Sequence, residues 1–101
     1  MSMVQSLESK LNTLIEQRKE KFRRSIKVQL LNNTGLTKVE VIVHYAEEKH
    51  VPFFEEILED IDKNVIKEIL EEYSKNGFII KITDNIHFKR MNIWFKKGEE
   101  A

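Results

Sequence analysis

The hydrophobic pattern of this chain changes its period three times, and this alternation constrains the fold more than any other feature. Apolar residues recur at helical spacing over residues 4–24 and alternate with polar residues over 38–45. They return to helical spacing over 52–76 and alternate again over 78–95. Because a helix and a strand each bury one apolar side against another element, the pattern predicts an α+β fold: N-terminal amphipathic helix, β-hairpin, helical middle and C-terminal β-hairpin.

Length and composition favour one compact unit with short loops. A chain of 101 residues can bury one modest core, and three Gly and one Pro leave few residues for turns. We expect a single domain over residues 1–101, with frayed ends at 1–3 and 98–101. The absence of cysteine, of a signal peptide and of a long apolar run favours a cytoplasmic protein that does not enter a membrane.

The first third of the chain predicts a helix followed by a hairpin. The apolar stripe of the helix consists of Val4, Leu7, Leu11, Leu14, Ile15 and Phe22. The basic cluster Lys19–Arg24 would close this helix, where cations suit the negative end of the helix dipole. The segments Ser25–Leu31 and Lys38–Tyr45 are rich in β-branched residues and flank the turn formers NNTGLT, which predicts two paired strands.

Residues 52–76 predict helix with an interruption. Pro52 suits a first helical turn, the glutamates after it complement the positive end of the helix dipole, and Asn76-Gly77 is a C-cap signal. The apolar residues of the first and second halves point about 100° apart at a helical period. This offset predicts two helices, or one kinked helix, with Asp62 or Asn64 as a second N-cap.

The end of the chain predicts a second hairpin. The runs FIIKIT and IHFKRMNIWF flank Asp84-Asn85, two residues that tolerate the left-handed backbone of a two-residue turn. Such a turn sets Phe78 opposite Met91. Together with the first hairpin, it predicts a four-stranded antiparallel sheet packed with helices.

This register places basic and aromatic side chains on one side of the last hairpin. That side comprises Ile79, Lys81, Phe88, Arg90, Asn92 and Trp94. Such a mixture suits base stacking and phosphate neutralisation, or a hot spot for a protein partner. The better supported interpretation is that the N-terminal helix covers this side as a second core layer, because that helix must bury its own stripe.

Charge is segregated along a chain whose formal net charge is zero. Residues 1–46 carry eight basic and four acidic side chains, residues 47–77 carry four and ten, and residues 78–101 carry five and three. The acidic middle offers a second candidate surface, for a basic partner, formed by Glu55, Glu56, Glu59, Asp60, Glu68 and Glu71. A solvated helical face is the simpler interpretation of these residues.

The sequence gives no support for a metal, a cofactor or catalysis. His44, Glu47, Glu48 and His50 have metal-ligand chemistry but match no metal-binding spacing, so we expect a solvated loop. Glycine-rich phosphate loops and the nucleophile elbow are absent, and there is no cysteine nucleophile. We therefore expect no metal, no cofactor and no enzymatic activity.

The order helix, short turn, helix and hairpin over residues 52–95 resembles the second half of a winged-helix DNA-binding domain. The segment NVIKEILEEYSKN, which the resemblance makes a recognition helix, is acidic where DNA contacts need basic or amide side chains. The sequence therefore favours a small protein-binding or regulatory module, of a kind that phages and other mobile elements encode. Nucleic-acid binding is the alternative, and a homodimer through Leu7, Leu11 and Leu14 is a further one.

Overall fold

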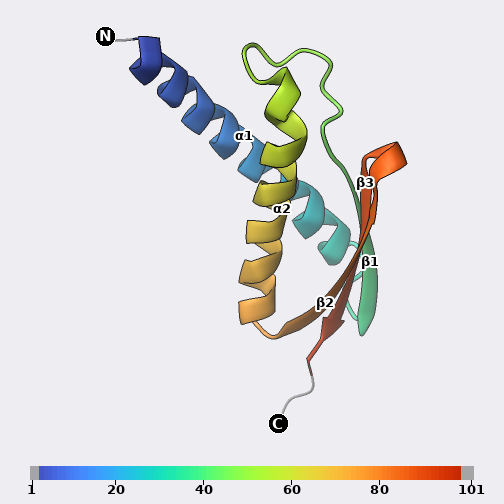
Figure 1. Ribbon diagram of the computed structural model, residues 1–101. Helices are drawn as coiled ribbons and strands as arrows, with labels where there is room; N and C mark the ends of the chain where they lie inside the picture. The colour runs from blue at the N-terminus through green and yellow to red at the C-terminus, as the bar shows by residue number, and fades with distance from the viewer. Residues whose placement is uncertain (1–2, 99–101) are drawn as a thin grey trace.

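The computed structural model describes the backbone of residues 3–98 and the side chains of residues 6–98. Its elements are α1 (Met3–Leu31), β1 (Lys38–His44), the 3-10 turn η1 (Glu55–Ile57), α2 (Leu58–Lys75), β2 (Phe78–Asn85), the 3-10 turn η2 (Ile86–Phe88) and β3 (Arg90–Lys97) (Figure 1). The fraying expected at residues 1, 2 and 99–101 lies outside the described residues. Of the other two residues expected to fray, Met3 lies in α1, and Gly98 donates a hydrogen bond to Gly77.

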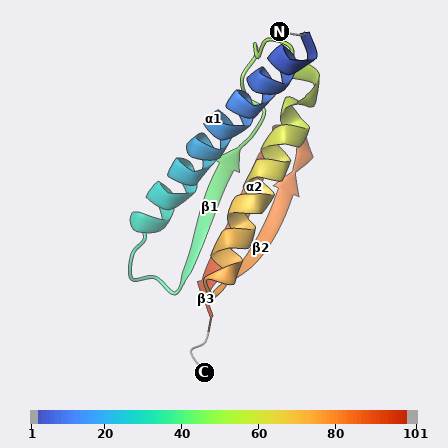
Figure 2. The same cartoon turned by 90° about the vertical axis from the view of Figure 1, so that its left-hand side faces the viewer.

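The fold has two layers, a sheet and a pair of helices. The three strands form an antiparallel sheet in the order β1-β3-β2. Figures 1 and 2 show α1 and α2 against the same face of this sheet, where they run in the same direction. The predicted α+β class is confirmed, with two helices and a three-stranded antiparallel sheet.

The core lies between the helices and the sheet. The strands contribute alternate residues to it, namely Val39, Val41, Val43, Met91, Ile93 and Phe95. The helices contribute Phe22, Ile26, Val65, Ile66, Ile69 and Leu70. The rings of Tyr73, Phe78 and Phe95 meet edge to face, with centroids 5.4 to 6.0 Å apart, where α2 leads into β2.

The predicted strand Ser25–Leu31 is wrong, because this segment continues α1. Its apolar residues also fit a spacing of four that begins one turn earlier, since Phe22 and Ile26 are buried and Leu30 packs against the core. Val28, which a strand would have placed on the same side as Ile26, is 48% exposed. The predicted four-stranded sheet therefore loses its first strand.

The extension of α1 also changes the meaning of the basic cluster Lys19–Arg24. This cluster lies in the middle of the helix, and the last turn carries no basic residue, so the explanation by the helix dipole is wrong. Instead, Lys19 Nζ lies 3.5 Å from Glu68 Oε2, and Arg23 Nη2 lies 2.8 Å from Glu72 Oε1. Basic residues of the first third of the chain thus pair with acidic residues of the middle third, across the contact between α1 and α2.

The predicted interruption of residues 52–76 at Asp62 is also wrong, because α2 is one helix from Leu58 onwards. Asp62 does not cap a helix but is fully buried on the same side of α2 as Leu58 and Val65. Asp62 lies on the buried side of α2 between the apolar residues of its first half and those of its second half. The apparent offset has two causes: the buried stripe of α2 includes a charged residue, and Phe54 precedes the helix.

The two ends of the helical middle differ in how well the sequence signals predicted them. Pro52 precedes η1 and lies in no helix, whereas the C-cap signal is confirmed. Asn76 donates its N–H to carbonyl groups of the last turn, and Gly77 adopts a φ of 97°, which glycine tolerates. Without a helix–turn–helix in residues 52–75, the resemblance to a winged-helix domain has no support from the fold.

The last hairpin forms, but the prediction of Asp84-Asn85 as its turn is wrong, because both residues are paired in β2 and a longer turn follows them. Asn85 pairs with Arg90, so four residues form the turn. Phe78 lies opposite Lys97, six residues beyond the predicted partner Met91. Because this shift is even, each strand residue stays on its predicted side of the sheet.

Candidate binding surface

The face of the sheet that points away from the helices, here called the open face, carries alternate residues of all three strands. These are Lys38, Glu40, Ile42 and His44 of β1, Ile79, Lys81, Thr83 and Asn85 of β2, and Arg90, Asn92, Trp94 and Lys96 of β3. Figure 1 shows that neither α1 nor α2 lies over this face. The expectation that the N-terminal helix covers it is therefore wrong, because α1 packs Ile15, Phe22, Ile26 and Leu30 against the opposite face.

Trp94 lies at the centre of the open face. On β3 it is directly opposite Glu40 of β1 and Lys81 of β2. Lys38 Nζ lies 4.8 Å from the ring centroid of Trp94, within the range of a cation–π interaction. Asn92 donates from Nδ2 to Glu40 Oε2 over 3.4 Å, which is a long hydrogen bond. The structure thus brings together three of the predicted site residues, Lys81, Asn92 and Trp94.

Phe88 and Arg90 lie at one end of the open face. Phe88 belongs to η2 rather than to a strand, and its side chain is 69% exposed. The guanidinium carbon of Arg90 lies 5.9 Å from the centroid of that ring. Arg90 Nε is buried and has no hydrogen-bond partner among the described residues. The longer turn therefore moves Phe88 off the sheet but keeps it beside Arg90.

The open face combines net positive charge with exposed apolar groups. Its four basic residues are Lys38, Lys81, Arg90 and Lys96, and its one acidic residue is Glu40. Ile42 and Ile79 on the two outer strands are exposed on the same side. Trp and Arg beside aliphatic groups are typical of the energetic centres of protein interfaces.

Half of the predicted acidic surface has partners inside the fold. The three pairs are Glu68–Lys19, Glu59–Lys63 and Glu55–His50. The remaining members, which are exposed and make no ion pair with other described residues, are Glu56, Asp60 and Glu71. The acidic residues thus contribute in part to contacts of α1 and of the loop after β1, which leaves a smaller free acidic surface than predicted.

Arg18 and Asp62 form a buried ion pair between α1 and α2 that the sequence analysis missed. Arg18 donates from Nε and Nη2 to the two carboxylate oxygens of Asp62 over 2.8 and 2.7 Å. Arg18 Nη1 also lies 2.7 Å from Glu48 Oε1, and Ala46 donates its N–H to Asp62 over 2.7 Å. The pair therefore ties the loop after β1 to both helices. Its only sequence signal is a charged residue at an apolar position of each stripe.

The charges of this cluster stabilise one another. The hydrogen bond from Arg18 lowers the pKa of Glu48 to about 2. Burial opposes the charged form of Arg18, but the hydrogen bonds to Asp62 and Glu48 outweigh it and raise the pKa of Arg18 above its usual range. A general acid or base works best with a pKa near the operating pH. These shifts therefore fit a structural role for Arg18 and Glu48.

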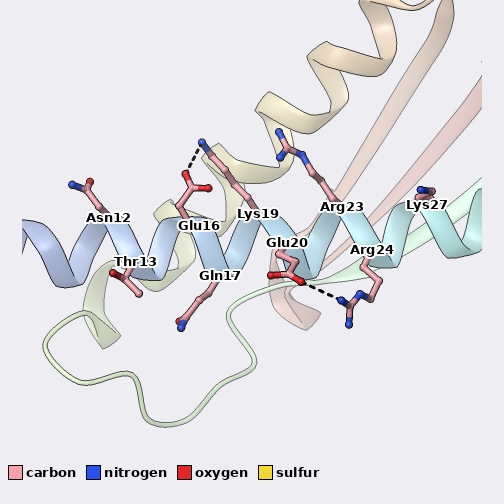
Figure 3. Close-up of a pocket in the computed structure, with 9 residues that line it drawn as sticks. All are labelled: Asn12, Thr13, Glu16, Gln17, Lys19, Glu20, Arg23, Arg24 and Lys27. Atoms are coloured by element: carbon pink, nitrogen blue, oxygen red, sulfur yellow. Dashed lines mark hydrogen bonds and ion pairs between the residues drawn. The ribbon is translucent and has the colours of Figure 1, made fainter.

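Among the depressions on the helical side of the molecule, two differ in the elements that form their walls. One runs along α1, and Figure 3 shows that its nine lining side chains all belong to that helix, so no second element forms an opposing wall. The other is a groove of about 620 Å³ between α1 and residues 48–54, with Leu14 and Phe53 among its walls. Its charged lining includes Arg18 and Glu48, which are paired with each other and so are not free to act on a ligand. It also includes Lys10, whose Nζ lies 4.4 Å from the ring centroid of Phe53.

The residues with metal-ligand chemistry are not gathered into one site. His44 Nδ1 lies 3.5 Å from Glu47 Oε1, whereas Glu48 is held by Arg18. Within the described part of the chain, no group of three or more such side chains could hold a metal ion.

None of the described helices is long and apolar enough to cross a membrane.

Comparison with known proteins adds no relative to this description. No family model, no curated protein and no solved structure matches the chain. The functional argument therefore rests on the open face and on the chemistry of its residues.

Proposed function

We propose that this chain is a small non-enzymatic module that binds a partner protein through the open face. The observation that carries the proposal is a sheet face that neither helix covers, with Trp94 at its centre and Arg90 on the same strand. Both residue types are enriched where protein interfaces gain most of their binding energy. A solvent-facing sheet surface also suits a protein partner better than a small substrate, which needs a concave site.

The charge of the open face specifies the chemistry of the partner. Four basic side chains and one acidic side chain give the face a net positive charge. A complementary surface presents carboxylates around an apolar centre, which would lie on Trp94 and on the exposed Ile42 and Ile79. The basic groups would mainly raise the association rate, and the apolar centre would mainly slow dissociation.

A single-stranded nucleic acid is the second candidate, because Trp94 and Phe88 beside basic groups could stack bases and neutralise phosphates. Two contacts favour the protein partner. Glu40, directly opposite Trp94, places a carboxylate at the centre of the face, where it would repel a phosphate. Lys38 already lies over the ring of Trp94 and competes with a stacked base. Phe88 lies beyond the strands.

An affinity purification from a lysate of the native host tests the proposal. The unmodified chain should recover a stoichiometric protein that the double variant Arg90→Ala, Trp94→Ala loses. The control is Lys67→Ala, Glu71→Ala, which truncates two exposed residues of α2 on the helical side and should keep the partner. Circular dichroism establishes that each variant is folded.

Recovery of the same protein by the folded double variant would remove the open face from the interface. Binding of random single-stranded nucleic acid at ~50 mM salt that weakens steeply at ~200 mM would instead favour the second candidate. Absence of such binding at the lower salt concentration would exclude nucleic acid as the partner.

A further inference from the structure

The two outer edges of the sheet differ in how their backbone groups are satisfied. In β1, Ile42 donates its N–H to Gln29 Oε1 over 2.9 Å, and the Ile42 carbonyl accepts from Gln29 Nε2 over 2.8 Å. The side chain of Gln29 in α1 therefore occupies the place of a neighbouring strand. This contact satisfies edge groups of β1 that a further strand would otherwise bind, and so disfavours pairing there.

Among the described residues, none pairs with the edge of β2 in this way. Gly98 donates its N–H to the Gly77 carbonyl over 2.9 Å, which continues the β2–β3 register by one pair. Backbone groups in an antiparallel pair point alternately toward and away from the partner, so those of Phe78, Ile80 and Ile82 point to the free edge. Outside the sheet ladder, none of the described residues makes a hydrogen bond to these groups.

The side chains along this edge are those of a strand that accepts a neighbour. Ile79 and Ile82, which point to opposite sides of the sheet, are 56% and 47% exposed. Lys81 and Asp84 are the charged residues of β2, and no proline interrupts the strand. Edge strands with few charges and no proline are templates for the addition of a further strand.

We propose that the free edge of β2 pairs with β2 of a second copy of this chain, antiparallel and about a two-fold axis. An edge strand is complementary to itself in this orientation, and two-fold symmetry is the commonest in soluble oligomers. Two copies would form one six-stranded sheet with four helices on one side. The two open faces would then join on the other side. The association itself does not depend on what the open face binds.

The side chains of β2 select the register of this pair. A pairing centred on Lys81 would set two ammonium groups opposite each other. A pairing centred on Ile80 would overlap only the first part of the strand. A pairing centred on Ile82 would overlap residues 79–85 and would set Lys81 of one copy opposite Thr83 of the other. The two Ile82 residues would then exchange their backbone hydrogen bonds, with Cα atoms about 5.5 Å apart.

Light scattering after size exclusion measures the association without any ligand. The unmodified chain should approach twice its 12.1 kDa mass as its concentration rises. Ile82→Lys, which would set two ammonium groups across the axis, should halve that mass. Val28→Lys is the matched control, because Val28 is also β-branched and 48% exposed but lies on α1, and it should leave the dimer intact.

A single cysteine tests the register, since the chain has no cysteine of its own. Ile82→Cys should form a disulfide-linked dimer on mild oxidation, because a Cα separation of about 5.5 Å suits a disulfide. Val28→Cys should form far less. A mass of one chain at every concentration would overturn the proposal, as would a dimer that folded Ile82→Lys retains. If Ile82→Lys does not fold, the yield of crosslinked Ile82→Cys relative to Val28→Cys decides the question.

Discussion

The two faces of the sheet are built from the same three strands, yet one is sealed and the other is free. Ile93 faces the helices and is fully buried, whereas Ile79 faces away and is 56% exposed. Alternation along a strand creates two faces but does not decide which of them is covered. Here the apolar stripes of α1 and α2 both dock on one side. A sheet with apolar residues on both faces therefore keeps one face uncovered only when its helices share the other one.

The largest loss of stability is expected from Asp62→Ala, which acts on the helical side of the sheet. This substitution leaves the guanidinium of Arg18 buried without its main partner, and breaking a buried ion pair typically costs about 3–5 kcal/mol. Unfolding in guanidinium chloride should show a free energy of unfolding lower by that amount. Asp60→Ala, an exposed substitution in the same helix, should stay within ~0.5 kcal/mol. Equal effects of the two would mean that the ion pair is not buried in solution.

A double substitution sharpens this result. Arg18→Met with Asp62→Leu replaces the ion pair by apolar groups of similar size, and such replacements are often neutral or stabilising. The double variant should therefore retain more stability than Asp62→Ala in the same unfolding experiment. A larger loss would indicate that the contacts of the pair to Glu48 and Ala46 contribute more than its burial costs.

The next effect compares the same truncation on each face. Ile93→Val removes one methylene from the covered side and should lower the free energy of unfolding by about 1 kcal/mol. Ile79→Val on the open face should change it by less than ~0.5 kcal/mol. Thermal or denaturant unfolding measures both. A comparable loss for Ile79→Val would show that another copy or another element covers the open face in solution.

A pH-dependent effect is expected from Glu48 at the rim of the buried cluster. The fold lowers the pKa of this carboxyl from 4.5 to about 2, mainly through the hydrogen bond from Arg18. Its ionised form therefore adds stability at and above pH 4.5, and this contribution is lost as the pH falls toward 2. Glu48→Gln should show a shallower loss of stability over this interval. Identical pH profiles would mean that Glu48 does not contact Arg18 in solution.

The last hairpin shows which part of a surface can be predicted from sequence. The sequence predicts its two faces correctly although it predicts the wrong turn residues, because an even shift of register leaves side chains on the same sides. Phe88 was the exception, since the longer turn takes it out of β3. The coverage of the face was predicted wrongly, because no pattern within the hairpin indicates where α1 docks.

The sequence by itself determined the α+β class, the sides of the last hairpin and the end of α2 at Asn76-Gly77. These depend on spacing and backbone preference within one element, which local residues carry. Only the tertiary structure decided that Ser25–Leu31 continues α1, that α1 leaves the open face free, and that Arg18 meets Asp62. These depend on contacts between residues far apart in the chain, where burial against a partner overrides local propensity.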